Sequence, residues 1–188
     1  MSRRIIGIVG KKGSGKDTAG EYLINKYGYV RFAFADQVKE VARALFNFND
    51  DQLNGTLKDK IDERYGLKPR QVFQRLGTEF GQFDIHKLFP EINNKISLRS
   101  FWTIGFRDFC QKNLDKNIVV TDVRFKHEFQ VIDELGGEFV KIERDGLPND
   151  IHLSENELAN FEFERILDNN YQKVDLYSQI DILILVPF

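Results

Sequence analysis

Short apolar, often β-branched runs alternate along this chain with segments whose apolar residues recur at helical spacing. The runs predict strands at residues 5–9, 29–34, 118–122, 138–142 and 163–167. The spacing predicts helices in between, of which the first ends at Gly28, the second is capped by Asp36, and another ends at Gly136. Further helices are expected after Lys68-Pro69-Arg70 and over about 100–114. The tail from Tyr171 predicts a helix, although residues 182–186 also fit a strand.

Strands separated by helices imply a parallel sheet, because a parallel crossover needs about a dozen residues and is usually helical. We therefore expect a three-layer αβα fold with a roughly five-stranded parallel sheet. The chain is read as one domain over 1–188, with a strand-free helical insertion at 47–100 and an irregular, lid-like segment at 144–160. Ligands of such sheets bind beyond the carboxyl ends of the strands.

Composition narrows the function classes. The 188 residues suit one compact domain, and a net charge of −2 argues against binding to a nucleic-acid polymer. Cys110 is the single cysteine, which excludes an internal disulfide and a multi-cysteine metal site. The apolar run near the N-terminus is too short for a signal peptide or a membrane helix, so we expect a cytoplasmic protein without a membrane partner.

A glycine-rich loop, Gly10-Lys11-Lys12-Gly13-Ser14-Gly15-Lys16-Asp17-Thr18, follows the first predicted strand and opens the first predicted helix. It fits G-x-x-x-x-G-K, with aspartate where serine or threonine is usual. The glycines let backbone N–H groups turn toward anionic oxygens, the helix adds its positive dipole end, and Lys16 supplies a mobile cation. The loop predicts a nucleoside triphosphate site formed by Gly10, Lys12, Gly13, Ser14, Gly15, Lys16, Asp17 and Thr18.

The sequence does not decide which residues near this loop bind the metal ion. Asp17 could bind Mg²⁺ directly or through a water molecule. Alternatively, Thr18 binds the ion, or Asp17 only stabilises the helix N-terminus through its negative charge. Asp122 ends the clearest strand, where a carboxylate is costly to bury without a partner, and that strand is expected beside the first. We therefore expect Asp122 to face Mg²⁺.

Other charged residues at strand ends are candidates for the second substrate. Arg124 follows Asp122 by two positions, which suits either a phosphate clamp or a salt bridge to Asp122. Asp36 and Lys39 follow the second strand, where a helix cap is the simpler interpretation of Asp36. Arg144 follows the fourth strand and is expected to stabilise charge on a moving phosphoryl group. His152, in the segment after it, is a poor candidate for a general base.

A polar helical face near residue 75 is a further candidate for the binding site of the second substrate. Gln71, Gln74, Arg75 and Thr78 recur at spacings of three and four, opposite an apolar stripe. Such a face suits an acceptor phosphate, although an ordinary solvated face explains the spacing equally simply. Trp102 could stack on a base, but aromatic residues at helical spacing more often belong to a core.

The blocks together resemble one family, the deoxynucleoside monophosphate kinases of bacteriophages and large DNA viruses. The resemblance covers most of the chain and rests on the order of five blocks: Gly10 to Thr18; Phe34-Ala35-Asp36 with Lys39; Pro69-Arg70-Gln71 with Gln74-Arg75-Leu76-Gly77-Thr78-Glu79; Thr121-Asp122-Val123-Arg124-Phe125 with Glu128; and Arg144 with His152, Ser154 and Glu155.

The resemblance implies transfer of the γ-phosphate of ATP to a deoxynucleoside monophosphate, with Mg²⁺ required and a homodimer plausible. It also implies that Arg75 belongs to the monophosphate site. Asp36, Lys39, Arg70, Gln74, Trp102 and Arg124 are further candidates for that site, and Lys16, Asp122, Arg124 and Arg144 are the candidates for catalytic roles. Two alternatives stand beside it. One is another small-molecule kinase, of the phosphomevalonate or dephospho-coenzyme A type, and the other is a nucleotide-binding switch without an acceptor.

Overall fold

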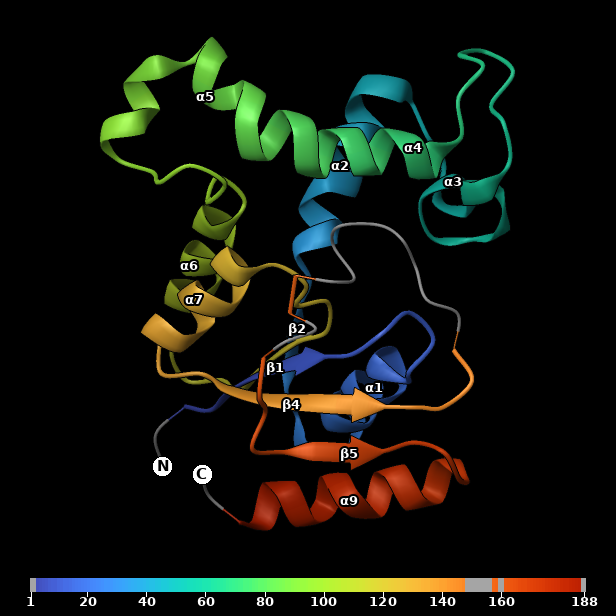
Figure 1. The fold of residues 1–188 in the computed structure, drawn as a ribbon, viewed down its shortest axis with the longest axis vertical. Coiled ribbons are helices and arrows are strands. Elements are labelled where there is room, and N and C mark those ends of the chain that lie inside the picture. Colours follow the sequence, from blue (N-terminus) through green and yellow to red (C-terminus); the bar gives the residue numbers. More distant parts are fainter. Residues whose placement is uncertain (1–2, 148–156, 159–160, 187–188) are drawn as a thin grey trace. The chain divides into compact units, whose positions relative to one another are not determined.

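The computed structural model describes residues 3–147, 157–158 and 161–186 (Figure 1). The strands are β1 (Ile5–Val9), β2 (Val30–Phe32), β3 (Ile118–Val120), β4 (Glu138–Glu143) and β5 (Ile166–Asp168). The helices are α1 (Lys16–Tyr27), α2 (Phe34–Phe46), α3 (Asp50–Asn54), α4 (Pro69–Gln74), α5 (Ile85–Leu88), α6 (Thr103–Lys112), α7 (Lys126–Glu134) and α9 (Lys173–Leu185). Two 3₁₀ turns, η1 (Thr56–Asp59) and η3 (Pro90–Asn94), and a π-helical segment, η2 (Arg75–Asp84), complete the described elements.

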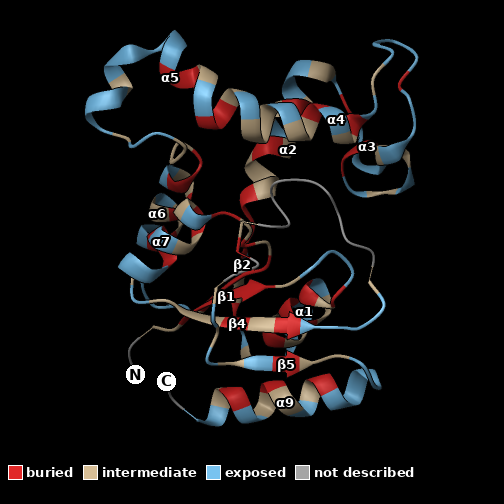
Figure 2. Ribbon diagram, viewed as in Figure 1, coloured by how far each residue is buried: buried red, intermediate tan, exposed pale blue. Residues whose placement is uncertain are grey.

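The five strands form one parallel sheet in the order β2-β3-β1-β4-β5. This confirms the predicted three-layer α/β fold and the expected pairing of β3 with β1, in which Gly7 lies opposite Val120. All five residues of β1 are buried, as a central strand covered on both faces requires (Figure 2). The sheet lies in a unit formed by residues 1–33 and 107–188.

Helices cover both faces of the sheet. One face packs against α1 and α9 around a buried apolar cluster consisting of Ile6, Ile8, Ala19, Leu23, Tyr29, Val119, Val140, Ile142, Leu167, Leu176, Ile180 and Leu183. On the other face Phe129 of α7 stacks on Phe139 of β4, with ring centroids 3.7 Å apart. Gly7 leaves room for this pair, because a Cβ atom there would lie 2.8 Å from the Phe139 ring.

The C-terminal helix is fastened to α1 by polar contacts. The Asp181 carboxylate accepts hydrogen bonds from the hydroxyls of Tyr22 at 2.9 Å and Tyr27 at 2.7 Å, and from the Lys26 ammonium at 2.8 Å. The hydrogen bond from Lys26 is the main reason that the pKa of Asp181 is lowered. Helix α1 ends at Gly28, as predicted, since this residue has a φ of 69° and its N–H caps the last turn.

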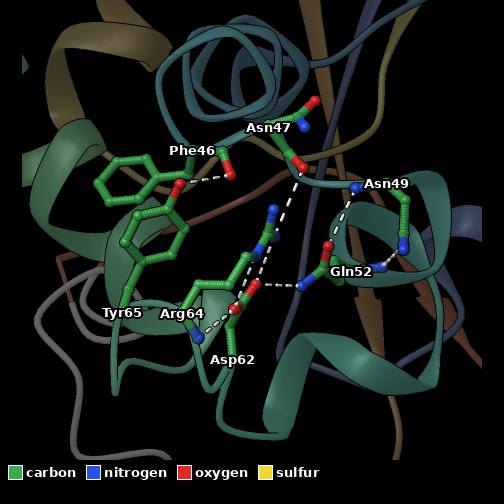
Figure 3. Close-up of polar contacts among 7 residues, drawn as sticks. All are labelled: Phe46, Asn47, Asn49, Gln52, Asp62, Arg64 and Tyr65. Atoms are coloured by element: carbon green, nitrogen blue, oxygen red, sulfur yellow. Dashed lines mark hydrogen bonds and ion pairs between the residues drawn. The ribbon is translucent and has the colours of Figure 1, made fainter.

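Residues 34–106 form a second compact unit, which is helical. Its own apolar cluster consists of Ala42, Phe48, Leu53 and Val72. A buried carboxylate, Asp62, organises the loop between η1 and α4: it accepts hydrogen bonds from Gln52 at 2.7 Å and from the Arg64 guanidinium at 2.6 Å (Figure 3). These partners hold the pKa of Asp62 well below its usual range. The loop is thereby ordered by a satisfied buried charge rather than by strands.

Several predicted boundaries were wrong. The second strand ends at Phe32, and α2 begins at Phe34, so Asp36 lies in the first turn of α2 and does not cap it. The fifth strand begins at Ile166, because Phe163 instead packs against the Phe129 ring. Residues 182–185 continue α9, which confirms the predicted helical tail. Within the described ranges, none of the helices has the length and apolar character that crossing a bilayer would require.

Candidate active site

The backbone of the loop after β1 can only be built with glycine at three positions. Gly10, Gly13 and Gly15 have φ angles of 153°, 83° and 108°. Gly10 is also closely packed, because a Cβ atom there would lie 2.6 Å from the carbonyl oxygen of Ile142 and from the hydroxyl of Ser14. The sequence motif is therefore realised as a tight turn leading into α1.

Lys16 is the first residue of α1, and its long side chain folds back over the loop. It is buried, with 8% of its surface exposed, and its ammonium donates to the carbonyl oxygens of Gly10 and Lys11, the latter at 2.8 Å. The cation is thus held at the mouth of a helix N-terminus, where an anion is favoured. Exchange of these two carbonyl partners for phosphate oxygens would give Lys16 charge-assisted hydrogen bonds.

The Ser14 hydroxyl gives a second indication of a polar ligand at this loop. Ser14 is 1% exposed, and among the described residues nothing hydrogen-bonds to its Oγ. A buried hydroxyl normally has a partner, which can be water or a ligand. The loop therefore fits the phosphate group that its sequence predicts.

The residues expected to hold Mg²⁺ lie on neighbouring elements. Asp17 is exposed in the first turn of α1 and Thr18 is half-buried beside it. Asp122 follows β3, and the preceding Thr121 packs directly against α1, since a Cβ atom on Gly20 would lie 2.5 Å from its methyl group. Mg²⁺ at nucleotide sites binds one or two protein oxygens and completes its shell with phosphates and water. These hard oxygen donors fit such an ion, and the sharing of roles between Asp17 and Thr18 stays a prediction.

The segment after β3 differs from the expectation for Arg124. Strand β3 ends at Val120, so Asp122 and Arg124 lie on a loop rather than two positions apart on a strand. The shape of the loop is set by Glu128, one turn into α7, whose single oxygen Oε2 accepts hydrogen bonds from the backbone N–H groups of Arg124 and Phe125. Strand alternation therefore does not determine the side-chain directions of Asp122 and Arg124, and the Glu128 contact holds the backbone at Arg124 and Phe125.

Glu128 has no role in the residue-by-residue prediction, although it belongs to the blocks that carry the resemblance. It is 5% exposed, and burial together with the nearby Asp122 charge raises its pKa to about 8. The signal in the sequence is its place three residues after Phe125, where a glutamate can accept the first free N–H groups of a helix.

Arg144 is exposed directly after β4, at the same edge of the sheet as the glycine-rich loop. The remainder of the predicted lid falls largely outside the described residues, and this includes His152, Ser154 and Glu155.

In the helical unit, the predicted substrate residues on α2 contact each other and α3. Lys39 donates to Asn54 at 2.8 Å and to Asp36 at 3.4 Å. Because Asp36 is inside the first turn of α2, it lies one turn before Lys39 and pairs with it as an i, i+3 ion pair. The two residues thus form one small polar group at the start of α2.

The helix that begins at Pro69, as predicted, carries three further candidates. Arg70 forms a two-point ion pair with Asp59, including a contact from Nη2 at 2.9 Å. Gln74 ends α4 and is half-buried, and Arg75 is exposed at the start of η2. From Arg75 to Asp84 the backbone is π-helical, with more residues per turn than an α-helix, so the α-helical spacing assumed for Arg75 and Thr78 does not apply there.

Trp102 packs against the π-helical segment. It is buried, and its indole N–H donates to the carbonyl of Gly77 at 3.1 Å. The ring lies so close to Gly81 that a Cβ atom there would be 2.0 Å from the indole nitrogen. Trp102 therefore has a packing role, and a contact with substrate stays a prediction.

Comparison with known proteins identifies the family to which this chain is similar. The profile of the family described as "Deoxynucleotide monophosphate kinase" matches residues 4–65 and 56–180. A protein of Acanthamoeba polyphaga mimivirus named "Putative deoxynucleotide monophosphate kinase" is 37% identical over 181 residues, which cover 94% of this chain and 93% of that protein.

Solved structures are similar to this chain at much lower sequence identity. TT1252 from Thermus thermophilus is 16% identical, covers 100% of both chains and superposes with a TM-score of 0.50, which supports the fold alone. Dephospho-CoA kinase from Campylobacter jejuni is 14% identical over 96% of this chain and 95% of that chain, with a TM-score of 0.47. The match along the family profile, the identity to the viral protein and the glycine-rich loop after β1 together show that this chain belongs to the deoxynucleotide monophosphate kinase family.

Proposed function

We propose that this protein transfers the γ-phosphate of ATP to a deoxynucleoside monophosphate, with Mg²⁺ bound to the nucleotide. The family assignment supports the general part of this function, namely that the chain is a nucleotide kinase and therefore a phosphotransferase. The observation that supports ATP as the phosphate donor is buried Lys16, whose ammonium folds over a glycine-rich loop at a helix N-terminus. The family description supports a deoxynucleoside monophosphate as the acceptor.

The two substrates are assigned to different parts of the chain. ATP is assigned to the sheet-bearing unit, where the loop N–H groups and Lys16 would bind the phosphates. Mg²⁺ would be held there by Asp122 and by Thr18 or Asp17, and when bound it would neutralise phosphate charge. The monophosphate is assigned to the helical unit, with its phosphate on Arg75 and Arg70 and further contacts from Asp36, Lys39 and Gln74, while Trp102 remains a candidate for the base.

The reaction needs positioning and charge stabilisation rather than a strong base. An oxygen of the acceptor monophosphate forms a bond to the γ-phosphorus of ATP, and the bond from that phosphorus to the β,γ-bridging oxygen breaks. ADP leaves and a deoxynucleoside diphosphate is formed. Lys16, Arg124 and Arg144 would stabilise the charge on the transferred group. Arg70 would exchange Asp59 for the acceptor phosphate, because one guanidinium fork cannot bind both in the two-point mode.

A phosphoryl-transfer screen tests the proposal. The protein is incubated with ATP and Mg²⁺ and with each deoxynucleoside and ribonucleoside monophosphate in turn, and the diphosphate product is measured. Dephospho-coenzyme A and mevalonate phosphate serve as acceptors for the alternative kinase class. We expect turnover that depends on a deoxynucleoside monophosphate. Hydrolysis of ATP at one rate with every acceptor would instead indicate a nucleotide switch, and transfer confined to the other acceptors would contradict the proposed substrate.

A further inference from the structure

Asn169, the residue after β5, connects the end of this edge strand to the glycine-rich loop. Its backbone N–H donates to the carbonyl of Glu143 at the end of β4, at 2.9 Å. Its side-chain amide donates to the carbonyl oxygen of Ser14, at 2.7 Å. One half-buried asparagine thereby bonds both to the sheet and to the loop predicted to bind phosphate.

The contact is close enough to constrain the residue after Ser14. A Cβ atom on Gly15 would lie 2.4 Å from the Asn169 amide nitrogen. Gly15 also has a φ of 108°, which L side chains rarely adopt. Gly15 is thus required both by its backbone conformation and by the approach of Asn169.

The hydrogen bond to Ser14 also orients a neighbouring donor. The carbonyl of Ser14 and the N–H of Gly15 belong to one planar peptide unit, and in a trans peptide they point in opposite directions. The described residues contain no cis peptide bond. While Asn169 holds the Ser14 carbonyl toward β5, the N–H of Gly15 is directed away from β5, onto the opposite side of the loop.

We infer that Asn169 is a positioning residue of the phosphate site, which presets the Ser14–Gly15 peptide so that the Gly15 N–H is available to an anion. The inference rests on the proposed function, because it assumes that the loop binds the phosphates of ATP. A donor that already points toward the ligand favours binding. If the peptide had to rotate when the phosphate binds, the free-energy cost of that rotation would lower the affinity.

Asn169 is itself held in place from α9. The Gln179 side chain accepts a hydrogen bond from the N–H of Asp168 at 2.9 Å and donates to the carbonyl of the same residue at 2.7 Å. The next residue, Asn170, accepts from the N–H of Asp145 at 2.7 Å. Figure 1 shows α9 running beside β5, and the Gln179 contacts join this helix to the strand end that precedes Asn169.

The test compares nucleotide with an anion that has no base. We would measure the affinities of ATP and of inorganic tripolyphosphate for the wild type, Asn169→Ala and Asn169→Asp. Aspartate has nearly the shape of asparagine but repels the Ser14 carbonyl instead of donating to it. We expect Asn169→Asp to lower the affinity for ATP and for tripolyphosphate by about tenfold or more. Asn169→Ala should lower both affinities by a smaller factor. The KM for the monophosphate should stay within about twofold, because the acceptor phosphate is assigned to other residues.

Asn113→Asp is the matched control. The Asn113 amide donates to the carbonyl of Phe109 at 2.9 Å, which is the same kind of bond at the end of α6. This variant should bind both ligands like the wild type. Thermal unfolding of each variant separates loss of affinity from loss of fold, and if Asn169→Asp does not fold, Asn169→Ala and Asn169→Ser carry the comparison.

The outcomes distinguish the inference from the function on which it rests. Wild-type protein that binds neither ATP nor tripolyphosphate would remove the phosphate site itself. Wild-type binding with equal affinities in folded Asn169 variants would overturn the positioning role alone. Weaker binding of ATP with unchanged binding of tripolyphosphate would also overturn it, because Asn169 would then act on the nucleoside part of ATP.

Discussion

Glu128 accepts a hydrogen bond from the backbone N–H of Arg124 at 2.8 Å, and the same oxygen accepts from Phe125 at 3.0 Å. A buried carboxylate on α7 thus holds the backbone at Arg124, two residues after Asp122. Because only one oxygen is used, a neutral acid can make the same two contacts. This allows the site to keep its shape while the pKa of Glu128 is raised to about 8 by burial and by the Asp122 charge.

Replacement of Glu128 should change how stability depends on pH. The folded pKa lies above the unfolded one, so between these values the folded state holds more protons, and the free energy of unfolding falls as pH rises from about 5 to about 8. Glu128→Gln keeps an acceptor for both N–H groups and should remove this fall. Glu128→Ala leaves both donors unsatisfied and should cost about 1–3 kcal/mol.

Urea unfolding at several pH values between 5 and 8, without nucleotide or metal, measures this effect. Glu79→Gln is the control, because it makes the same chemical change at an exposed glutamate. A Glu128→Gln variant that retained the full wild-type pH slope would show that another group is responsible.

Lys16→Ala should lower kcat by about a hundredfold or more, because it removes the cation expected to stabilise charge on the transferred phosphoryl group. Steady-state phosphoryl transfer at saturating ATP measures it. Lys116→Ala removes an exposed lysine and should leave kcat unchanged. Wild-type turnover in the Lys16 variant would remove the loop from the mechanism.

Arg75→Ala should raise the KM for the monophosphate by about 10- to 100-fold, as expected for the loss of a charged hydrogen bond to phosphate. The KM for ATP should change far less. Arg43→Ala is the comparison in the same unit, because Arg43 is a half-buried arginine that forms an ion pair with Asp50. If Arg75→Ala affected both substrates equally, Arg75 would have no specific place in the acceptor site.

The two glycines of the π-helical segment should respond differently to alanine. Gly81→Ala places a methyl group 2.0 Å from the Trp102 indole nitrogen and should destabilise the protein by about 1–3 kcal/mol. Gly77→Ala meets only Val38 at 3.6 Å and should be neutral or stabilising by up to about 1 kcal/mol. Chemical denaturation of the pair measures the difference. Similar losses in both variants would argue against the tight Trp102 contact.

The correct predictions from sequence concern features with local causes. Glycines that alone permit the backbone of the loop, Gly28 at the end of α1 and Pro69 at the start of α4 are chemical signals within a few residues of the structure they produce. The alternation of apolar runs with helical periods is also local, and it was sufficient for a five-stranded parallel sheet with β3 beside β1.

The predictions that failed, and the residues that were missed, depend on contacts between distant segments. Asp36 was placed at a helix cap because nothing nearby shows that β2 stops at Phe32. The π-helical geometry after Arg75 accompanies the packing of Trp102 against Gly81, across 21 residues of chain. The bond from Asn169 to Ser14 spans 155 residues.

The sequence by itself thus determined the fold class and the phosphate loop, because backbone conformation and hydrophobic period are properties of short segments. Only the tertiary structure decided that Glu128 is buried near the Asp122 charge and that Asn169 holds the Ser14 peptide. The bond from Asn169 to Ser14 leaves no periodic trace in the sequence, because it depends on where folding brings two distant polar groups.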